Sequence, residues 1–112
     1  MQPRVKVWVE KNGLLVFSDY RAELLAHIAK TGSISGGAER MGLSYRRAWG
    51  KVKEIEQNLG VRLVRSEVGG LGGGRTKLTP EGEEFLARYR AFRAAAESHV
   101  GHDFAQRFTR DG

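Results

Sequence analysis

The 112-residue sequence contains no cysteine and no apolar run long enough to cross a membrane. The absence of cysteine excludes disulfide scaffolds and thiolate metal sites. A membrane-spanning helix needs about 20 mostly apolar residues, so that class is excluded as well. The N-terminus also lacks the apolar segment of a signal peptide, and we therefore expect a cytoplasmic protein. What the sequence has instead is positive charge, with 19 Lys and Arg against 13 Asp and Glu, a formal net charge of +6.

The excess of positive charge favours a polyanionic partner, because Lys and Arg that neutralise phosphates release the counterions condensed on nucleic acid. Taken alone this is weak evidence, since many soluble proteins carry a similar charge. The length allows one domain with one modest core and leaves no room for two. No internal repeat or long linker divides the sequence, so we expect a single domain over residues 1–112.

The first segment is predicted to be a β-hairpin over residues 4–17. Charged and apolar residues alternate over residues 4–9, as in a strand with one apolar face. Asn12-Gly13 is a strong hairpin signal, because both residues tolerate positive φ. Leu14–Phe17 then returns as the second strand.

Residues 19–59 show three helical patterns in succession. Ser18 is a typical N-cap for the first helix, and Gly32 ends that helix. Either Ser33 or Ser35 caps a short second helix. A tight turn follows and leads into a third, longer helix. This is the order of a helix-turn-helix, the motif whose second helix enters the major groove of DNA.

The third helix, predicted over Ser44–Leu59, has one apolar side and one basic side. Ala48, Val52 and Ile55 fall in one sector of the helical wheel and predict the side that faces the core. Arg46 lies on the opposite side, within the N-terminal turns that usually reach base edges. It is therefore the residue best placed for a bidentate contact with guanine.

Other residues of the third helix are further candidates for DNA contact. Arg47 reaches either a base or a phosphate, and Lys53 reaches a phosphate. Gly50 would let the helix lie close to the bases, at a cost of about 1 kcal/mol in helix propensity. Tyr45 and Trp49 either contact the sugar-phosphate backbone and thymine methyls or simply widen the core. The alternative for the whole basic side is the solvated face of an ordinary amphipathic helix.

A second hairpin, which we call the wing, is predicted over residues 61–79. Glycines of the stretch 69–74 turn the chain between its two short strands. Arg75 and Lys77 on the returning strand would meet phosphates. The complete set of predicted DNA-contacting residues is Ser33, Ser35, Ser44, Tyr45, Arg46, Arg47, Trp49, Gly50, Lys53, Arg75 and Lys77.

The glycines of the wing also allow a competing interpretation. Gly69 and Gly74, followed by Arg75-Thr76, are one substitution from a P-loop, whose lysine would be replaced by arginine. A P-loop follows a buried parallel strand and opens a helix that holds phosphate. Here residues 77–80 indicate a strand and then a separate helix start, so we favour the wing over a nucleotide site. A merely flexible loop is the third interpretation.

Residues 79–81, Thr-Pro-Glu, are typical of a helix start, and we expect a helix over residues 80–100. Gly101 is predicted to end it, leaving 101–112 as a short helix or a disordered tail. The helix carries an aromatic stripe that is either core or partner surface. Because so long a helix exceeds what one small domain covers, we expect a homodimer. The residues predicted for the dimer interface are Phe85, Tyr89, Phe92 and Ala96.

No arrangement of residues predicts catalysis. His99 and His102 beside Asp103 have a spacing that suits a metal, but no further ligand cluster accompanies them. Glu54 and Glu56 read as solvated charge. No Ser-His-Asp set and no pair of catalytic carboxylates can be argued. We therefore expect no enzymatic activity, no metal and no cofactor.

Three motifs carry a family resemblance: Gly32–Ser35 (GSIS), Gly42–Trp49 (GLSYRRAW), and Gly69–Gly74 (GGLGGG) before Leu78-Thr79. Together they resemble the N-terminal domain of the ModE family of molybdate-responsive bacterial transcription regulators. The first motif, with Leu-Gly-Val-Arg-Leu at 59–63, equally resembles the DNA-binding domain of LysR-type regulators. The resemblance covers about residues 4–95.

This resemblance implies a dimeric winged helix-turn-helix that binds a roughly palindromic operator in double-stranded DNA, near genes for molybdate transport or molybdoenzymes. The recognition helix would be Ser44–Leu59 and the wing Gly69–Lys77. Full-length members sense molybdate through C-terminal oxyanion-binding domains, which this sequence, ending at Gly112, does not contain. We therefore expect a nucleoid-associated regulator, away from membranes, that acts constitutively or with a separate molybdate-sensing protein.

Three alternatives are kept beside this interpretation. A truncated LysR-like regulator would bind DNA in the same way. A protein–protein interaction module on the same fold would carry its basic face incidentally. The interaction module predicts that DNA binding has no steep salt dependence and that the activity tolerates Arg46→Ala. A P-loop enzyme would show saturable nucleotide binding that is abolished by changing Arg75.

Overall fold

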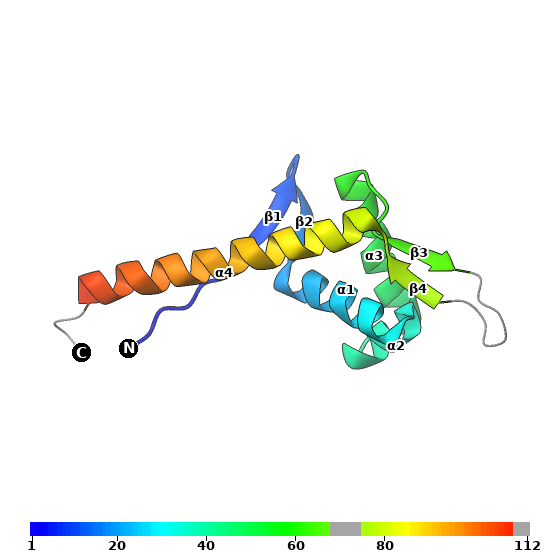
Figure 1. Ribbon diagram of the computed structural model, residues 1–112, viewed down its shortest axis with the longest axis horizontal. Coiled ribbons are helices and arrows are strands. Elements are labelled where there is room, and N and C mark those ends of the chain that lie inside the picture. Colours follow the sequence, from blue (N-terminus) through cyan, green and yellow to red (C-terminus); the bar gives the residue numbers. More distant parts are fainter. Residues whose placement is uncertain (68–74, 109–112) are drawn as a thin grey trace.

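The computed structural model describes residues 1–67 and 75–108, and Figure 1 shows their arrangement. The protein is elongated, with a longest dimension of 63 Å against 29 and 23 Å, because one helix extends well beyond the rest. The predicted class, mainly helical with two small hairpins and a long C-terminal helix, is confirmed. The elements are β1 Trp8–Lys11, β2 Leu14–Ser18, α1 Asp19–Thr31, α2 Ile34–Arg40, α3 Tyr45–Leu59, β3 Val64–Glu67, β4 Arg75–Leu78 and α4 Pro80–Phe108.

The core lies where α1, α2 and α3 pack together against β2. Leu24, Leu25 and Ile28 of α1 are completely buried there, as are Val52 and Ile55 of α3. The helical-wheel prediction for α3 is therefore confirmed, and its opposite side faces outward. Burial of such aliphatic side chains contributes roughly 1.5–3 kcal/mol each and supplies most of the driving force for folding.

Hydroxyl side chains begin all three helices of this core, as predicted. The backbone N–H of the residue three positions on donates to each hydroxyl, which satisfies a donor that the helix itself leaves free. For α2 the cap is Ser33 rather than Ser35. Gly32 and Gly60 end α1 and α3 at φ values of 79° and 84°, in the left-handed region that favours glycine. The three bonds are Arg21 N to Ser18 Oγ, Gly36 N to Ser33 Oγ and Arg47 N to Ser44 Oγ.

The start of α4 is held against the segment that leads into β3. The Thr79 hydroxyl accepts a hydrogen bond from Gly82 N at 2.9 Å and donates one to Arg62 O at 2.6 Å. Gly82 is buried because it lies directly on the Leu63 carbonyl, where a Cβ would overlap the oxygen. The predicted helix start is therefore present, and its glycine allows a close approach that no other residue permits.

The N-terminal hairpin is shorter than predicted. Its first strand begins at Trp8, and the register pairs Trp8 with Ser18, the last residue of β2. Residues 4–7 have no strand left to pair with, because the chain turns into α1 directly after Ser18. They instead pass beside α4, where the Tyr89 hydroxyl lies 3.2 Å from Val7 O (Figure 1).

The prediction that Gly101 ends the last helix is wrong, since α4 continues to Phe108. A single glycine inside a helix costs only about 1 kcal/mol. Side-chain pairs four residues apart offset that cost in the turns that follow. Phe104 and Phe108 stack with ring centroids 4.6 Å apart, and Arg107 donates to Asp103 at 2.9 Å. Residues 101–108 are therefore helix rather than tail.

The strands of the wing pair antiparallel, Val64 with Leu78 and Glu67 with Arg75. A P-loop would require a helix directly after the glycines, so this pairing favours the wing. The predicted glycine turn at 69–74 lies outside the described residues. Within residues 1–67 and 75–108, no helix combines the length and the apolar character that a membrane crossing requires.

Candidate nucleic-acid interface

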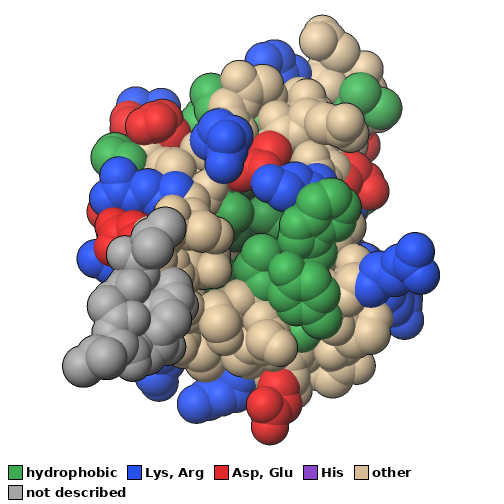
Figure 2. Space-filling model, turned by 90° about the vertical axis from the view of Figure 1, so that its right-hand side faces the viewer, with side chains coloured by type: hydrophobic (Ala, Val, Ile, Leu, Met, Phe, Trp, Pro, Cys, Tyr) green, Lys and Arg blue, Asp and Glu red, His purple; other side chains and the backbone are tan. Residues whose placement is uncertain are grey.

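The outer side of α3 exposes two large aromatic side chains. Tyr45 and Trp49 remain 54% and 45% exposed, although both are large and aromatic. Figure 2 views the molecule from the end that carries α2, α3 and the wing. Hydrophobic side chains gather near the middle of this end, with Lys and Arg and some Asp and Glu around them. An exposed apolar patch with a polar rim is typical of a binding surface.

Arg46 and Arg47 stand on the first turn of α3, where Ser44 caps the helix. Both are exposed, and neither forms an ion pair or a side-chain hydrogen bond within the described residues. Gly50, one turn further on, has open space around it, since a Cβ placed there would meet nothing within 4 Å. No packing among the described residues therefore accounts for a glycine at this position.

A hollow of about 220 Å³ lies between α2, α3 and the wing. It brings together five of the predicted DNA-contacting residues from separate elements. Polar side chains dominate its lining, and three of its members are cationic. The other six predicted residues do not line it: Ser44, Arg46, Arg47, Gly50, Arg75 and Lys77. The lining residues are Ser33, Ile34, Ser35, Tyr45, Trp49, Lys53, Arg62, Val64, Arg65, Ser66 and Thr76.

Lys53 forms contacts within the protein that the sequence did not predict. Its ammonium group donates to Glu56 at 3.1 Å and lies 5.6 Å from the centre of the Trp49 ring. Both contacts draw the charge along α3 and leave the side chain half-buried. Lys53 would therefore have to exchange a carboxylate for a phosphate in order to contact DNA.

The prediction that Glu56 is solvated is wrong, because it is buried. Its carboxylate accepts hydrogen bonds from Leu63 N at 2.7 Å and Val64 N at 3.2 Å. Burial raises the pKa of Glu56, but these two bonds and the bond from Lys53 outweigh it and hold the pKa below its ordinary value. Glu56 thus fastens the beginning of β3 to α3. The sequence gives little signal for this, because the partners are backbone groups of another element.

The wing is attached to the helix-turn-helix at a second point. Thr76 N donates to Gly32 O at 2.8 Å, and the Arg75 guanidinium lies against the α-carbon of Gly32. Arg75 itself remains exposed beside the turn that leads into α2. The two attachments, at Glu56 and Gly32, fix the wing relative to α2 and α3.

Two cationic residues near the wing, Arg62 and Arg65, were not among the predicted DNA-contacting residues. Arg65 is the cross-strand partner of Lys77, and Glu67 forms ion pairs with both, at 3.5 and 3.3 Å. Arg62 lies just before β3, exposed, and lines the hollow. The hairpin register around the glycines would have predicted Arg65, because cross-strand partners share one face of a hairpin.

The four residues predicted for a dimer interface do not share one environment. Tyr89 is only 5% exposed and stacks on Phe17 with ring centroids 5.7 Å apart, so it belongs to the core of its own chain. Phe85 is half-buried against the same ring. Phe92 remains 50% exposed, and Ala96 is partly exposed one turn further along. Tyr89 is therefore corrected to a core residue.

The histidines of α4 gain no metal-binding partners from the fold. Within the described residues, no group of three His, Asp or Glu could hold a metal ion. Asp103, the carboxylate next to His102 in sequence, is paired with Arg107.

The three-helix core, the exposed third helix and the attached β-hairpin define a winged helix-turn-helix. The crystal structure of the CbnR_DBD–DNA complex has the same fold, with a TM-score of 0.57 over 77% of this chain and 93% of that chain, at 22% identity. The family model for bacterial regulatory helix-turn-helix proteins of the lysR family matches residues 21–83. The chain therefore belongs to the lysR family of bacterial regulatory helix-turn-helix proteins.

Two curated relatives carry molybdenum or ModE in their descriptions, in agreement with the resemblance found in the sequence. The molybdenum-pterin-binding protein MopB of Rhodobacter capsulatus is 41% identical over 88 residues, which are 79% of this chain and 32% of MopB. The DNA-binding transcriptional dual regulator ModE of Escherichia coli (strain K12) is 37% identical over 89 residues, which are 80% of this chain and 34% of ModE. The chain spans about a third of the length of these relatives.

Proposed function

We propose that this chain is a sequence-specific, DNA-binding transcription regulator in which α3 reads bases and the wing contacts phosphates. The observation that carries the proposal is the first turn of α3, where Arg46 and Arg47 are exposed without ion-pair partners among the described residues. A guanidinium without a partner can form a bidentate bond to guanine and has no existing ion pair to break. The open space at Gly50 supports a close approach of this helix to base edges.

The hollow beside α3 supports a path for the sugar-phosphate backbone. Its hydroxyls, at Ser33 and Ser35, and its cations, at Arg62 and Arg65, suit phosphate oxygens. Arg75 and Lys77 extend the positive charge along the wing. The proposed work of the protein is binding rather than catalysis, at chromosomal DNA in the cytoplasm.

We further propose that two copies bind two half-sites of a roughly palindromic operator. An apolar groove of about 360 Å³ runs between the N-terminal hairpin, the end of α3 and α4, and exposed Phe92 lies in it. The last turns of α4 extend beyond the core (Figure 1). Pairing of this helix with a second copy would cover both surfaces.

The relatives' descriptions support control of genes for molybdate transport or molybdoenzymes. Molybdate sensing is proposed to reside outside residues 1–112. The matched region covers only about a third of each relative's length.

The test begins with selection of duplexes from a random-sequence library by the 112-residue protein. Fluorescence anisotropy then measures the affinity for the selected duplex and for a scrambled one across a salt series, with and without molybdate. We expect the selected duplex to bind at least about 10³-fold more tightly than the scrambled one. Molybdate should leave both affinities unchanged.

Three outcomes would contradict parts of the proposal. Failure of the library to enrich, with weak binding that vanishes with salt for every sequence, would favour a protein-binding module. A change of operator affinity on adding molybdate would contradict the proposal that sensing resides outside residues 1–112. Saturable binding of a nucleotide would revive the P-loop interpretation.

A further inference from the structure

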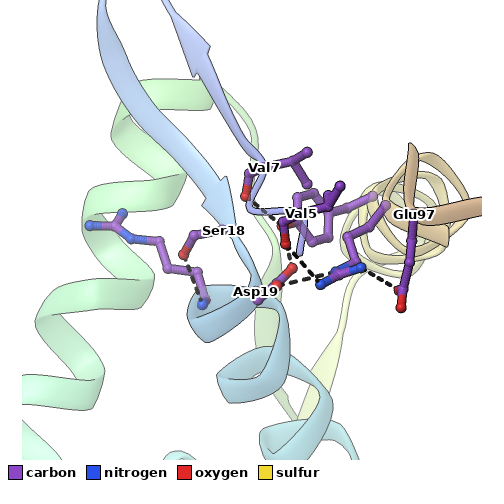
Figure 3. A network of polar contacts seen from close by, with 8 residues as sticks. Val5, Val7, Ser18, Asp19 and Glu97 are labelled. Atoms are coloured by element: carbon purple, nitrogen blue, oxygen red, sulfur yellow. Dashed lines mark hydrogen bonds and ion pairs between the residues drawn. The ribbon is translucent and has the colours of Figure 1, made fainter. Parts of the chain in front are cut away.

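A polar network joins α4 to the first turn of α1 and to the N-terminal segment (Figure 3). The Tyr89 hydroxyl donates to Asp19 at 2.6 Å and lies 3.2 Å from Val7 O. Arg93, one turn further along α4, donates to the other oxygen of Asp19 at 3.2 Å and reaches Val5 O at 3.5 Å. The labelled Asp19 in Figure 3 lies between the end of the hairpin and α4. One carboxylate therefore receives two donors from the same helix.

The state of charge in this network follows from its geometry. The hydrogen bond from Tyr89 lowers the pKa of Asp19, partly opposed by burial and assisted by Arg93. Burial, followed by the bond to Asp19, raises the pKa of Tyr89 far above its ordinary value. At neutral pH the carboxylate is therefore ionised and the phenol is protonated, which is the combination that makes a strong charge-assisted hydrogen bond.

The same turn of α1 is also tied to α3. Arg21, two residues after Asp19, is only 7% exposed and donates to Glu54 of α3 at 2.9 Å. The first turn of α1 thus carries an acid that holds α4 and a base that holds α3. We call this turn, with its two ties, the α1 strut.

Apolar packing alone would allow α4 a wider range of angles relative to α1 than packing combined with the hydrogen bonds to Asp19. Phe17 stacks on Phe85 and Tyr89, and this contact would survive loss of the Tyr89 hydroxyl. Stacked rings tolerate sliding, whereas two hydrogen bonds to one carboxylate permit little rotation about the contact. Tyr89 is buried, but the Asp19 side chain is 49% exposed and that of Arg93 28% exposed, so these bonds specify a geometry more than they add stability.

We infer that Asp19 and Tyr89 are positioning residues that set the angle between α4 and α3, and thereby the spacing between the two half-sites that a dimer can bind. The inference rests on the proposed function, because it requires two copies joined through α4. Dimeric readers place their helices one helical turn of DNA apart. The direction in which α4 leaves each copy would determine whether both helices meet the groove together.

The experiment uses the 112-residue protein and the duplex that it selects from a random library. The distance between half-sites is varied in single base pairs on both sides of the selected value, and a duplex with one half-site is included. The variants are Tyr89→Phe, which keeps the ring stack, and Asp19→Asn. Glu84→Gln is the matched control on α4, because Glu84 is exposed and its recorded partner is Arg88 of the same helix. Ile28→Val controls for loss of stability in the core.

We expect the parent to prefer its selected spacing over one altered by two base pairs by about tenfold. In Tyr89→Phe and Asp19→Asn this preference should fall below about threefold, while affinity for the single half-site stays within about twofold. The two control variants should keep the preference of the parent. Preserved spacing preference in both test variants would overturn the inference, and so would an equal loss in Ile28→Val. A parent that selects no two-site duplex would instead refute the proposed function, and the inference with it.

Discussion

Arg21 and Arg93 each bind a carboxylate of a neighbouring helix, whereas Arg46 and Arg47 have no such partner in the described part of the chain. The first two lie around the α1 strut and the second two on the first turn of α3. A guanidinium that is already paired fixes the distance between two helices, because its fork defines a geometry. An unpaired one remains available to a ligand. Arginine therefore fixes the helix arrangement at the start of α1 and contributes a candidate binding surface on α3.

Glycines divide between the two regions in the same way. Gly82 lies on the Leu63 carbonyl, where any side chain would overlap, while Gly50 of α3 has no neighbour within 4 Å of its missing Cβ. The first glycine is explained by packing within the chain and the second is not. Substitutions in the scaffold should thus change stability, and substitutions on the outer side of α3 should change DNA binding.

The largest expected effect is that of Gly82→Ala. The added methyl group must displace α4 from β3, and we expect the free energy of unfolding to fall by about 2–3 kcal/mol. Denaturant titration followed by circular dichroism measures it. Gly101→Ala on the same helix is the control, since its added methyl group meets open space. It should gain up to about 1 kcal/mol. Equal stability of the two variants would contradict the packing described for Gly82.

Arg46→Ala should leave the unfolding free energy within about 0.5 kcal/mol of the parent, because the side chain packs against nothing buried. It should cost about 1–3 kcal/mol of binding, concentrated at one base pair of the selected duplex. Anisotropy with a set of single-base variants of that duplex measures this. Lys77→Ala is the comparison, and it should weaken binding to all sequences and lower the salt slope by about one. If both variants bound like the parent, the outer side of α3 and the wing would not be the interface.

Gly50→Ala should change stability and DNA binding in opposite directions. We expect it to stabilise the protein by about 0.5–1 kcal/mol, because alanine is the better helix former and the site is open. Binding to the selected duplex should nevertheless weaken, since the methyl group would stand between the helix and the bases. Thermal unfolding and anisotropy on the same preparation give both values. A variant that gains stability and keeps full affinity would show that no close approach occurs there.

The smallest effect concerns acid stability. Asp19 and Glu56 have pKa values lowered by folding, below the reference values of 3.8 and 4.5. Their contribution is therefore present above those values and is lost as pH falls through the folded pKa. The melting temperature should stay flat from pH 7 to about 5 and decline below about pH 4. Glu56→Gln should flatten that decline, whereas Glu23→Gln, at an exposed position of α1, should follow the parent. Parallel curves for all three proteins would refute the role of Glu56.

Local signals predicted most of the fold. The caps at Ser18 and Ser44, the left-handed glycines 32 and 60, and the buried stripe of α3 depend on neighbours within one or two turns. Such patterns can be read directly from the sequence. Gly101 misled because a glycine near the end of a pattern resembles a C-cap, and only the aromatic pair that follows sustains the helix.

The parts of the site that the sequence did not predict depend on contacts between distant segments. Glu56 looks like any surface acid until β3 brings two backbone N–H groups to its carboxylate. Tyr89 looks like part of an exposed stripe until Phe17 and Asp19 approach it from another element. Arg46 and Arg47, in contrast, were predictable as exposed, because Ala48, Val52 and Ile55 form an apolar stripe on another side of the same helix.

The length of α4 gives the α1 strut a mechanical importance beyond its few bonds. The last tie to the core is at Arg93, and the helix then extends 15 residues to Phe108, or about 22 Å. A tilt of about 10° at the tie would move the far end by about 4 Å, roughly the rise of one base pair. Because α4 is long, a small change in its angle at Arg93 becomes a displacement of about one base pair at its far end. Rigid contacts at the α1 strut therefore matter more here than additional buried area.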